Sequence, residues 1–165
     1  MTLREIPSPE AMSAAWLVDR FGSTDAPGWS DVVENPDGEQ TFSRTGGPAV
    51  MCWASAQEVV ADLGTDRALS TGYFCRGGST ATMAEHAEGH DLALVDGRFL
   101  VDGWAAFVAG IGPCVLDLRD SRDRETALRL HEPFGTWTTA PEISEGTEEQ
   151  TGEAEEPILE QRYAV

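Results

Sequence analysis

The chain alternates between segments with the apolar spacing of helices and shorter segments with the spacing of strands. Apolar residues three and four positions apart predict helices, whereas short apolar or alternating runs predict strands. Helices are expected over residues 8–22, 52–63, 81–86 and 104–110. Strand-like runs cover 40–43, 68–75, 90–95, 98–102 and 114–118, and residues 122–130 fit either structure.

Capping residues and glycines mark the expected ends of the two longest helices. Ser8 is predicted to cap the first helix, and Gly22 to end it. Gly64 is placed to end the second helix. Between these helices, residues 23–48 are rich in Gly, Pro, Asp and Ser, which predicts a long irregular segment.

The composition changes near the C-terminus. Residues 138–165 hold eight glutamates against one arginine, with few bulky apolar side chains. Such a segment cannot bury enough surface to offset its chain entropy. We therefore expect an α+β domain over residues 1–137 and a mostly disordered acidic tail over residues 138–165.

The formal net charge of −18 limits the partners that the chain can bind. It argues against nucleic acid and anionic membrane surfaces, because both would repel the protein. A protein or peptide substrate, which could be basic, is compatible with this charge. The sequence has no apolar run long enough to span a bilayer and no secretory signal at its start, so we expect a cytoplasmic location or export without a classical signal peptide.

Residues 90–102 are predicted to form a β-hairpin with an ionisable residue at each open end. The Asp-Gly pair at 96–97 is a strong turn signal. With a three-residue loop over 95–97, His90 would lie directly opposite Asp102 on one face of the hairpin. A two-residue turn would instead place the two side chains on opposite faces. We predict the three-residue loop, which pairs a histidine with a carboxylate.

Cys52 is the candidate nucleophile that would complete a triad with this pair. It follows Gly-Gly-Pro at 46–48 and opens the predicted second helix. Only the thiolate of a cysteine is nucleophilic, and a helix N-terminus with a nearby imidazolium stabilises that anion. Cys75 and Cys114 lie in apolar strand-like runs, and three widely spaced cysteines do not suggest a disulfide framework.

A metal centre is the competing interpretation of these residues. His86 and His90 are four residues apart, and Cys52 or Cys75 could complete a site. Gly89 is expected to end the preceding helix before His90, which favours the triad, and we expect neither a metal nor another cofactor.

Neither a cluster of aspartates nor the third histidine has the pattern of a metal site. Asp117, Asp120 and Asp123 lack the glycine and the final glutamate of a calcium loop. His131, which precedes Glu132 and Pro133, is expected to be a surface or loop residue.

The order of these elements resembles the papain-like thiol fold, and within it the transglutaminase-like branch. The resemblance rests on "MCWASAQEVVADLG" and "GHDLALVDGRFLVDGWA" and covers residues 46–110. It implies a helix packed on an antiparallel sheet, with Cys52 attacking an amide or thioester carbonyl. It further implies that His90 transfers the proton, that Asp102 fixes its tautomer and that the Cys52 N–H helps to hold the oxyanion. Gln40 is the upstream candidate for a second oxyanion donor.

Two classes of function remain open from the sequence. The first is an enzyme: a cysteine peptidase, an amidase or deamidase, or a transglutaminase-like acyl transferase. The second is an acidic binding, inhibitor or immunity-type protein on the same scaffold, since a fold does not by itself imply activity.

Overall fold

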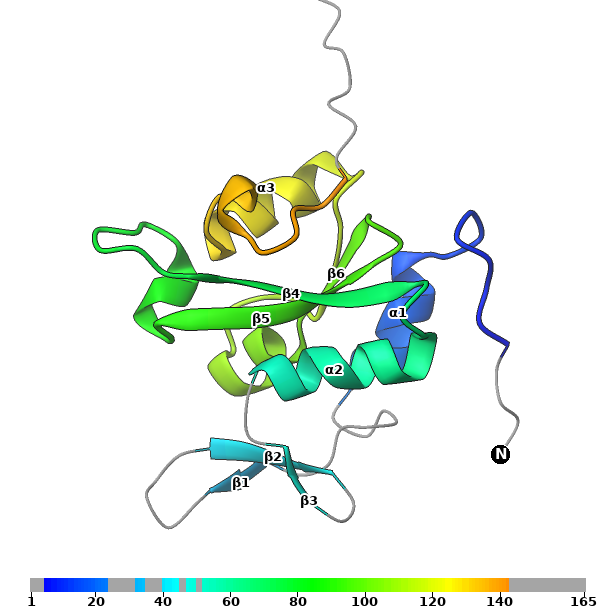
Figure 1. Ribbon diagram of the computed structural model, residues 1–165, viewed down its shortest axis with the longest axis horizontal. Coiled ribbons are helices and arrows are strands. Elements are labelled where there is room, and N and C mark those ends of the chain that lie inside the picture. The colour runs from blue at the N-terminus through cyan, green and yellow to red at the C-terminus, as the bar shows by residue number, and fades with distance from the viewer. Residues whose placement is uncertain (1–4, 24–31, 35–39, 45–46, 50–51, 143–165) are drawn as a thin grey trace, which may run out of the picture.

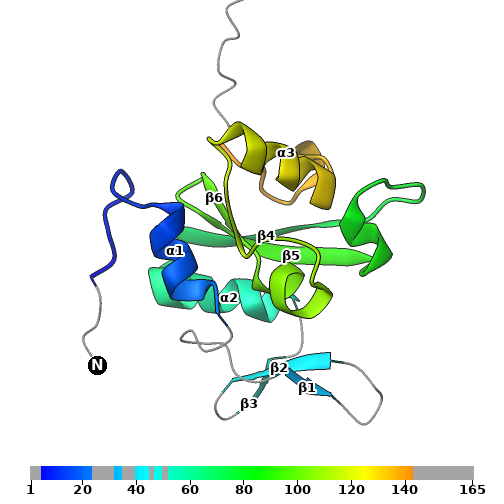
Figure 2. The same cartoon turned by 180° about the vertical axis from the view of Figure 1, so that it is seen from behind.

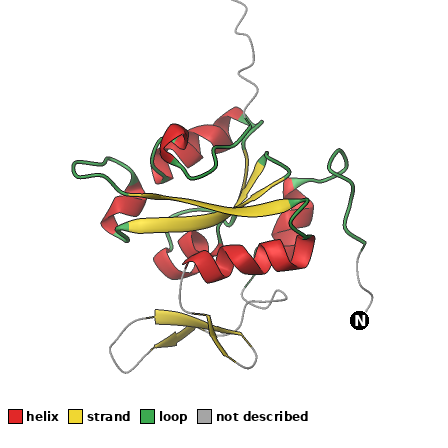
Figure 3. Cartoon of the chain, in the orientation of Figure 1, coloured by secondary structure: helices red, strands yellow, loops and turns green. Residues whose placement is uncertain are grey.

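A four-stranded antiparallel sheet forms the centre of the computed structural model, which describes residues 5–23, 32–34, 40–44, 47–49 and 52–142. Its strands lie in the order β4 (Ala68–Phe74), β5 (Gly89–Val95), β6 (Phe99–Val101) and β7 (Val115–Asp117). Helices cover both faces of this sheet (Figures 1 and 3). The predicted α+β class is therefore confirmed.

The two faces of the sheet form two apolar cores. One core lies beneath α1 (Ala14–Phe21) and α2 (Cys52–Leu63), seen from behind in Figure 2, and the other lies beneath α3 (Ser121–Leu130). Side chains alternate along the strands, as pleating requires. The first core takes Ala93, Val95, Phe99, Val101 and Val115, and the second takes Leu92, Leu94, Leu100 and Leu116.

The remaining elements are short. Single turns of helix occupy η1 (Thr82–Glu85), η2 (Ala105–Ala109, a π-helical turn) and η3 (Phe134–Thr136). A separate three-stranded sheet holds β1 (Val32–Glu34), β2 (Gln40–Arg44) and β3 (Gly47–Ala49), in the irregular part of the sequence. Figure 1 places it on the far side of α2 from the main sheet.

The first helix begins later than the sequence pattern predicts. Its cap is Ser13, whose hydroxyl accepts from the Trp16 N–H at 3.2 Å, and Ser8 is not the cap. Residues 9–11 form an isolated turn instead, because the Ser8 carbonyl accepts from Met12 N–H at 2.9 Å and the chain then leaves the helical conformation. The predicted end at Gly22 is confirmed.

The ambiguous residues 122–130 are helical because their N-terminus is capped. Asp120 accepts from the N–H groups of Arg122 and Asp123 at 2.9 and 3.2 Å, which satisfies donors that the helix itself leaves free. Asp117 forms an ion pair with Arg98, so these acids have structural partners in place of a calcium ion.

The β5–β6 hairpin does not have the predicted register. Val95 pairs with Phe99 and Leu94 with Leu100, so the loop holds residues 96–98 and not 95–97. Asp96 and Gly97 both have positive φ, 50° and 63°, in the manner of a primed turn, and the register moves by two residues. An even shift keeps every side chain on its predicted face, because the pleat repeats every two residues.

The turn of this hairpin is attached to the start of β4. The Arg67 guanidinium binds the Asp96 carboxylate at 2.6 and 2.8 Å, and the Asp96 N–H donates to the Arg67 carbonyl at 2.7 Å. Arg67 also donates to the Pro7 carbonyl at 2.8 Å. One mostly buried ion pair therefore joins three separate segments.

The described chain continues past the predicted domain boundary at residue 137. Thr138 N–H donates to the Gly72 carbonyl at 2.8 Å, and the Thr71 hydroxyl donates to the Thr139 carbonyl at 2.7 Å. This segment thereby forms hydrogen bonds with groups along the outer edge of β4, which no other strand of the sheet covers. Residues 143–165, most of the predicted acidic tail, lie outside the described residues, so their disorder stays a prediction.

Replacing Arg67 tests the role of this ion pair in stability. Arg67→Gln would leave the Asp96 carboxylate mostly buried without its cation, so we expect the free energy of unfolding to fall by about 2–4 kcal/mol. Urea denaturation measures the change. Arg119→Gln, at an exposed position, is the matched control and should change stability by less than about 0.5 kcal/mol. Equal effects of the two variants would contradict this role.

Candidate active site

The candidate site lies where β6 stops short of β5. The pairing of the two strands ends at Ala93 and Val101, so the first residues of β5 have no β6 neighbour. The next residue, Asp102, turns the chain: its N–H donates to the Cys114 carbonyl at 2.7 Å and its Oδ1 accepts from the Ala105 N–H at 2.9 Å. These bonds hold the Asp102 carboxylate in place at the end of the sheet.

His90 and Asp102 are joined by a buried hydrogen bond, as the sequence predicts. His90 Nε2 lies 2.6 Å from Asp102 Oδ2, and the two residues are 1% and 4% exposed. With the observed register, Asp102 lies diagonally from His90 and not directly opposite it. The contact forms because both side chains project from the same face and the side chains are long enough to span the diagonal.

Cys52 approaches the same histidine from the other layer of the fold. It is the first residue of α2, and its sulfur accepts from the Asp91 N–H at 3.3 Å. The thiol is an electrostatic neighbour of the His90 ring, although it forms no hydrogen bond of good geometry with Nδ1, which has no such partner among the described residues. The structure thus places Cys52 against the strand that carries His90, and pairs His90 with Asp102.

Strand β4 packs closely against β5 beside His90. A Cβ atom at Gly72 would lie 2.5 Å from the His90 carbonyl oxygen, so any side chain larger than hydrogen would push β5 away. Gly72 is therefore required where β4 passes Asp91, its partner in β5 and the residue after His90.

The electrostatics of the pair favour a charged histidine. Burial by itself would lower the pKa of His90, but the adjacent Asp102 carboxylate, aided by Cys52, raises that pKa to about 10. Burial likewise disfavours the Asp102 anion, yet His90 lowers the pKa of Asp102. The structure therefore supports an imidazolium–carboxylate pair beside the Cys52 sulfur.

His131 is a site residue that the sequence interpretation placed wrongly. It is 2% exposed and not a surface residue, and its ring stacks on that of His90 with centroids 5.8 Å apart and planes 4° apart. Ala127, Leu130 and His131 have the i, i+3, i+4 spacing of one helical face, which was the available signal. The Glu-Pro pair that follows His131 is typical of a loop, which is why the sequence predicts exposure there.

Tyr73 fixes the tautomer of His131. Its hydroxyl lies 2.7 Å from His131 Nδ1, and burial raises the pKa of Tyr73, so the phenol keeps its proton and donates it. Burial is also the main reason why the pKa of His131 falls to about 4, which leaves the ring neutral. The proton of His131 therefore sits on Nε2, 3.8 Å from Asp102 Oδ2.

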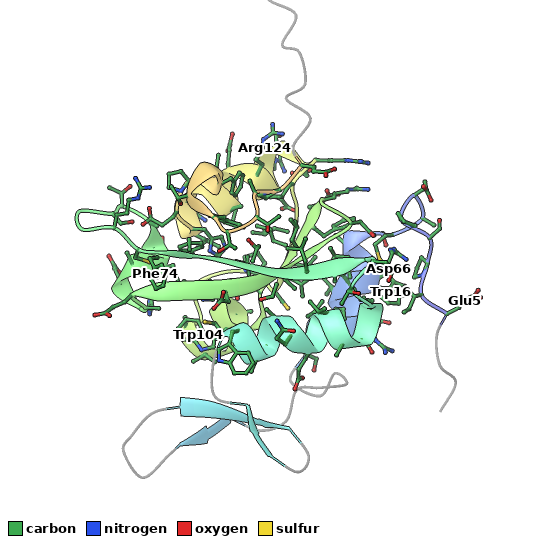
Figure 4. All side chains as sticks on the ribbon, in the orientation of Figure 1. Glu5, Trp16, Asp66, Phe74, Trp104 and Arg124 are labelled. Atoms are coloured by element: carbon green, nitrogen blue, oxygen red, sulfur yellow. The ribbon has the colours of Figure 1, made fainter. Side chains whose placement is uncertain are left out.

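Aromatic side chains surround the two histidines. Trp104 lies 5.4 Å from the His90 ring between centroids, and Tyr73 stacks on Trp137 at 5.4 Å. Figure 4 shows Trp104 near the end of α2 where the helix begins. These rings exclude water from the His90–Asp102 pair, which strengthens its electrostatic interactions.

The other two cysteines lie outside the triad. Burial raises the pKa of Cys114 to about 12, and its thiol donates to the Phe21 carbonyl at 3.3 Å. Burial also raises the pKa of Cys75, which follows β4. Gln40 begins β2, and its side chain is not among those that the structure describes.

The metal interpretation through His86 and His90 does not fit the geometry. His86 is exposed at the end of η1, while His90 is buried against Asp102. Within the described ranges, the group with ligand spacing is His90, Asp102 and His131, whose ligating atoms lie within 4.8 Å of one another. The 2.6 Å separation of His90 and Asp102 is that of a shared proton, and a metal ion would have to force these atoms apart.

Comparisons of the chain with protein-family models, curated proteins and solved structures gave no match. Among the helices that the structure describes, none has the length and apolar character needed to cross a membrane.

The charge states of the two buried histidines are directly measurable. Between about pH 5 and 9 we expect His90 to stay protonated and His131 to stay neutral with its proton on Nε2, because their pKa values are raised to about 10 and lowered to about 4. Long-range ¹⁵N NMR spectra of the imidazole rings report both charge and tautomer. A midpoint near the ordinary value of 6.5 for either ring would contradict this assignment.

The same shifts give opposite contributions to stability as the pH changes. The pKa of His90 is raised, so its contribution is complete below about pH 6.5 and is lost as the pH rises towards 10. The pKa of His131 is lowered, so its contribution is present above about pH 6.5 and is lost as the pH falls towards 4. Thermal melts of the unaltered protein and of His131→Gln across this range should show the acid-side loss weakened in the variant.

Tyr73→Phe tests the contact that fixes His131. The substitution keeps the ring but removes the donor, leaving Nδ1 of a buried imidazole without a partner. We expect a loss of about 1–3 kcal/mol in the free energy of unfolding and a mixture of His131 tautomers in the NMR spectrum. An unchanged tautomer would mean that another group sets it.

Proposed function

We propose that the protein performs thiol-dependent acyl chemistry on an amide or thioester, with Cys52 as the nucleophile. The observation that carries this proposal is that His90 is hydrogen-bonded to Asp102 through Nε2, while the Cys52 sulfur accepts from the N–H of the next residue of the strand, Asp91. This is the arrangement of nucleophile, base and orienting group that acyl transfer requires. The order of these elements along the chain, which resembles that of a papain-like, transglutaminase-like core, is consistent with the same assignment.

The roles of the three residues follow from chemistry. The Cys52 thiolate adds to the carbonyl carbon, and the peptide N–H groups at the start of α2, including its own, would stabilise the oxyanion. The His90 imidazolium protonates the leaving amine or thiol, and the acyl group remains on Cys52. Neutral His90 then takes a proton from the acceptor, and Asp102 holds the ring throughout.

The acceptor defines the kind of enzyme. Water as the acceptor gives a peptidase, amidase or deamidase, whereas an amine gives a transglutaminase-like acyl transferase. A protein or peptide substrate suits either case, and the net charge of −18 favours a basic one.

Alkylation rates distinguish a nucleophilic cysteine from an ordinary one. Between about pH 6 and 7, iodoacetamide should modify Cys52 at least about tenfold faster than Cys75 or Cys114, read by peptide mass spectrometry. His90→Ala should slow the reaction of Cys52 because it removes the neighbouring cation. His86→Ala, at an exposed position, is the control and should have no effect.

Acylation tests the chemical step itself. Brief treatment with p-nitrophenyl acetate should add one acetyl group to Cys52, and release of that group should be slower in Asp102→Ala. Equal alkylation of all three cysteines, together with no acetylated Cys52, would overturn the proposal and favour a binding protein.

A further inference from the structure

One carboxylate oxygen of Asp102 faces two histidines, of which the proposed triad uses only one. His131 Nε2 lies 3.8 Å from Asp102 Oδ2, the same oxygen that His90 Nε2 meets at 2.6 Å. One nitrogen of each ring and a carboxylate oxygen of Asp102 all lie within 4.8 Å of one another, and the two rings are parallel to within 4°. His131 is therefore placed to act on the His90–Asp102 pair.

The Nε2–H group of His131 brings the positive end of a dipole close to this oxygen. The Tyr73 hydroxyl, 2.7 Å away, donates to Nδ1 and leaves the proton of the neutral ring on Nε2. At 3.8 Å the group makes no hydrogen bond with Oδ2, but a dipole and a charge interact strongly at that separation where water is excluded. His131 and Asp102 are only 2% and 4% exposed, so water screens this interaction little.

The dipole acts on the His90 proton in two ways that have the same sign. It stabilises the Asp102 anion, so the carboxylate attracts the proton less strongly, and it repels the positive charge of the His90 imidazolium. A buried pair joined at 2.6 Å holds its proton tightly, whereas a general acid must release its proton in every reaction cycle. A neutral donor beside the pair weakens this hold without adding a competing charge.

The other ionisable groups around the pair come from several elements. They are Cys52 of α2, Tyr73 of β4, Cys75 after β4, Cys114 before β7 and Glu132 after α3. Burial raises the pKa of Tyr73, Cys75 and Cys114, so these three keep their protons. His131 is thus the neutral donor that lies beside the oxygen bound to His90.

We propose that His131 is a positioning residue for the thiol chemistry: its Nε2–H shares the Asp102 carboxylate with His90 and so makes the His90 proton available to the reaction. The inference rests on the function proposed for Cys52. His131 acts through Asp102 and His90, and it touches neither the substrate nor the sulfur. The proton affinity of His90 is measurable whether or not Cys52 reacts.

Substitutions at residue 131 separate the donor from the ring. His131→Gln keeps an N–H near the position of Nε2. His131→Phe keeps the ring but removes the donor, and it is combined with Tyr73→Phe so that no buried hydroxyl loses its acceptor. His86→Gln, at an exposed position, is the control.

The midpoint of the His90 titration, read from ¹⁵N NMR spectra of the ring, is the main measurement. The double variant should raise this midpoint by at least about 0.5 pH unit, because Asp102 then attracts the His90 proton without competition. His131→Gln should cause less than about half of that shift, and His86→Gln should cause none. A merely structural role predicts the opposite sign, because a loosened pair would let the midpoint fall towards 6.5.

Release of the acetyl group from Cys52 links the shift to the reaction. This step uses neutral His90 as the base, so below the midpoint the double variant should release the group about threefold more slowly at a given pH. The pH profile of release should move in the same direction as the NMR midpoint.

The outcomes separate this inference from the proposed function. A raised midpoint supports the role of His131, and if Cys52 is then not acetylated, only the proposed function fails. An unchanged or lowered midpoint overturns the role of His131, even where Cys52 is acetylated. If the double variant does not fold, His131→Asn replaces it, since its N–H lies near the position of Nδ1 and should not reproduce the effect of His131→Gln.

Discussion

The buried contact between His90 and Asp102 is the constraint around which the end of the sheet is organised. A carboxylate taken out of water must be compensated, and Asp102 accepts from His90 Nε2 and from the Ala105 N–H. Removing one partner of such a pair costs about 3–5 kcal/mol, because the other charge is left uncompensated. The aromatic residues Trp104, Tyr73 and Trp137, which pack around the pair, therefore contribute to its stability by keeping it out of water.

The two histidines next to Asp102 show how position decides charge. Both rings are buried and nearly parallel, but only His90 makes a short contact with the carboxylate. Two imidazolium ions at that separation would repel each other in a medium of low dielectric constant, so one proton is retained and the other excluded. The short contact with Asp102 favours the proton on His90, while burial lowers the pKa of His131, and Tyr73 fixes the tautomer of the neutral ring.

Much of the sheet and of the proposed triad could be predicted from local pattern. The helix from Cys52, the hairpin turn and the partnership of His90 with Asp102 depend on short-range signals: helical spacing, an Asp-Gly turn and the parity of a pleated strand. The register itself was wrong by two residues, because turn chemistry at Asp96 and Gly97 permits more than one loop. The contact between His131 and Tyr73 could not be predicted from local pattern, because it joins residues 58 apart in the sequence.

β6 is only three residues long, and this shortness has a consequence for the sheet as a whole. Had it continued by two more pairs, a strand carbonyl would compete for the Asp91 N–H that now donates to the Cys52 sulfur. Cys52, at the start of α2, would then find no free N–H on this edge of β5, because the added strand would occupy that edge. The incomplete ladder thus leaves a backbone donor of β5 available to a side chain of α2, and a longer, more regular hairpin would remove that contact.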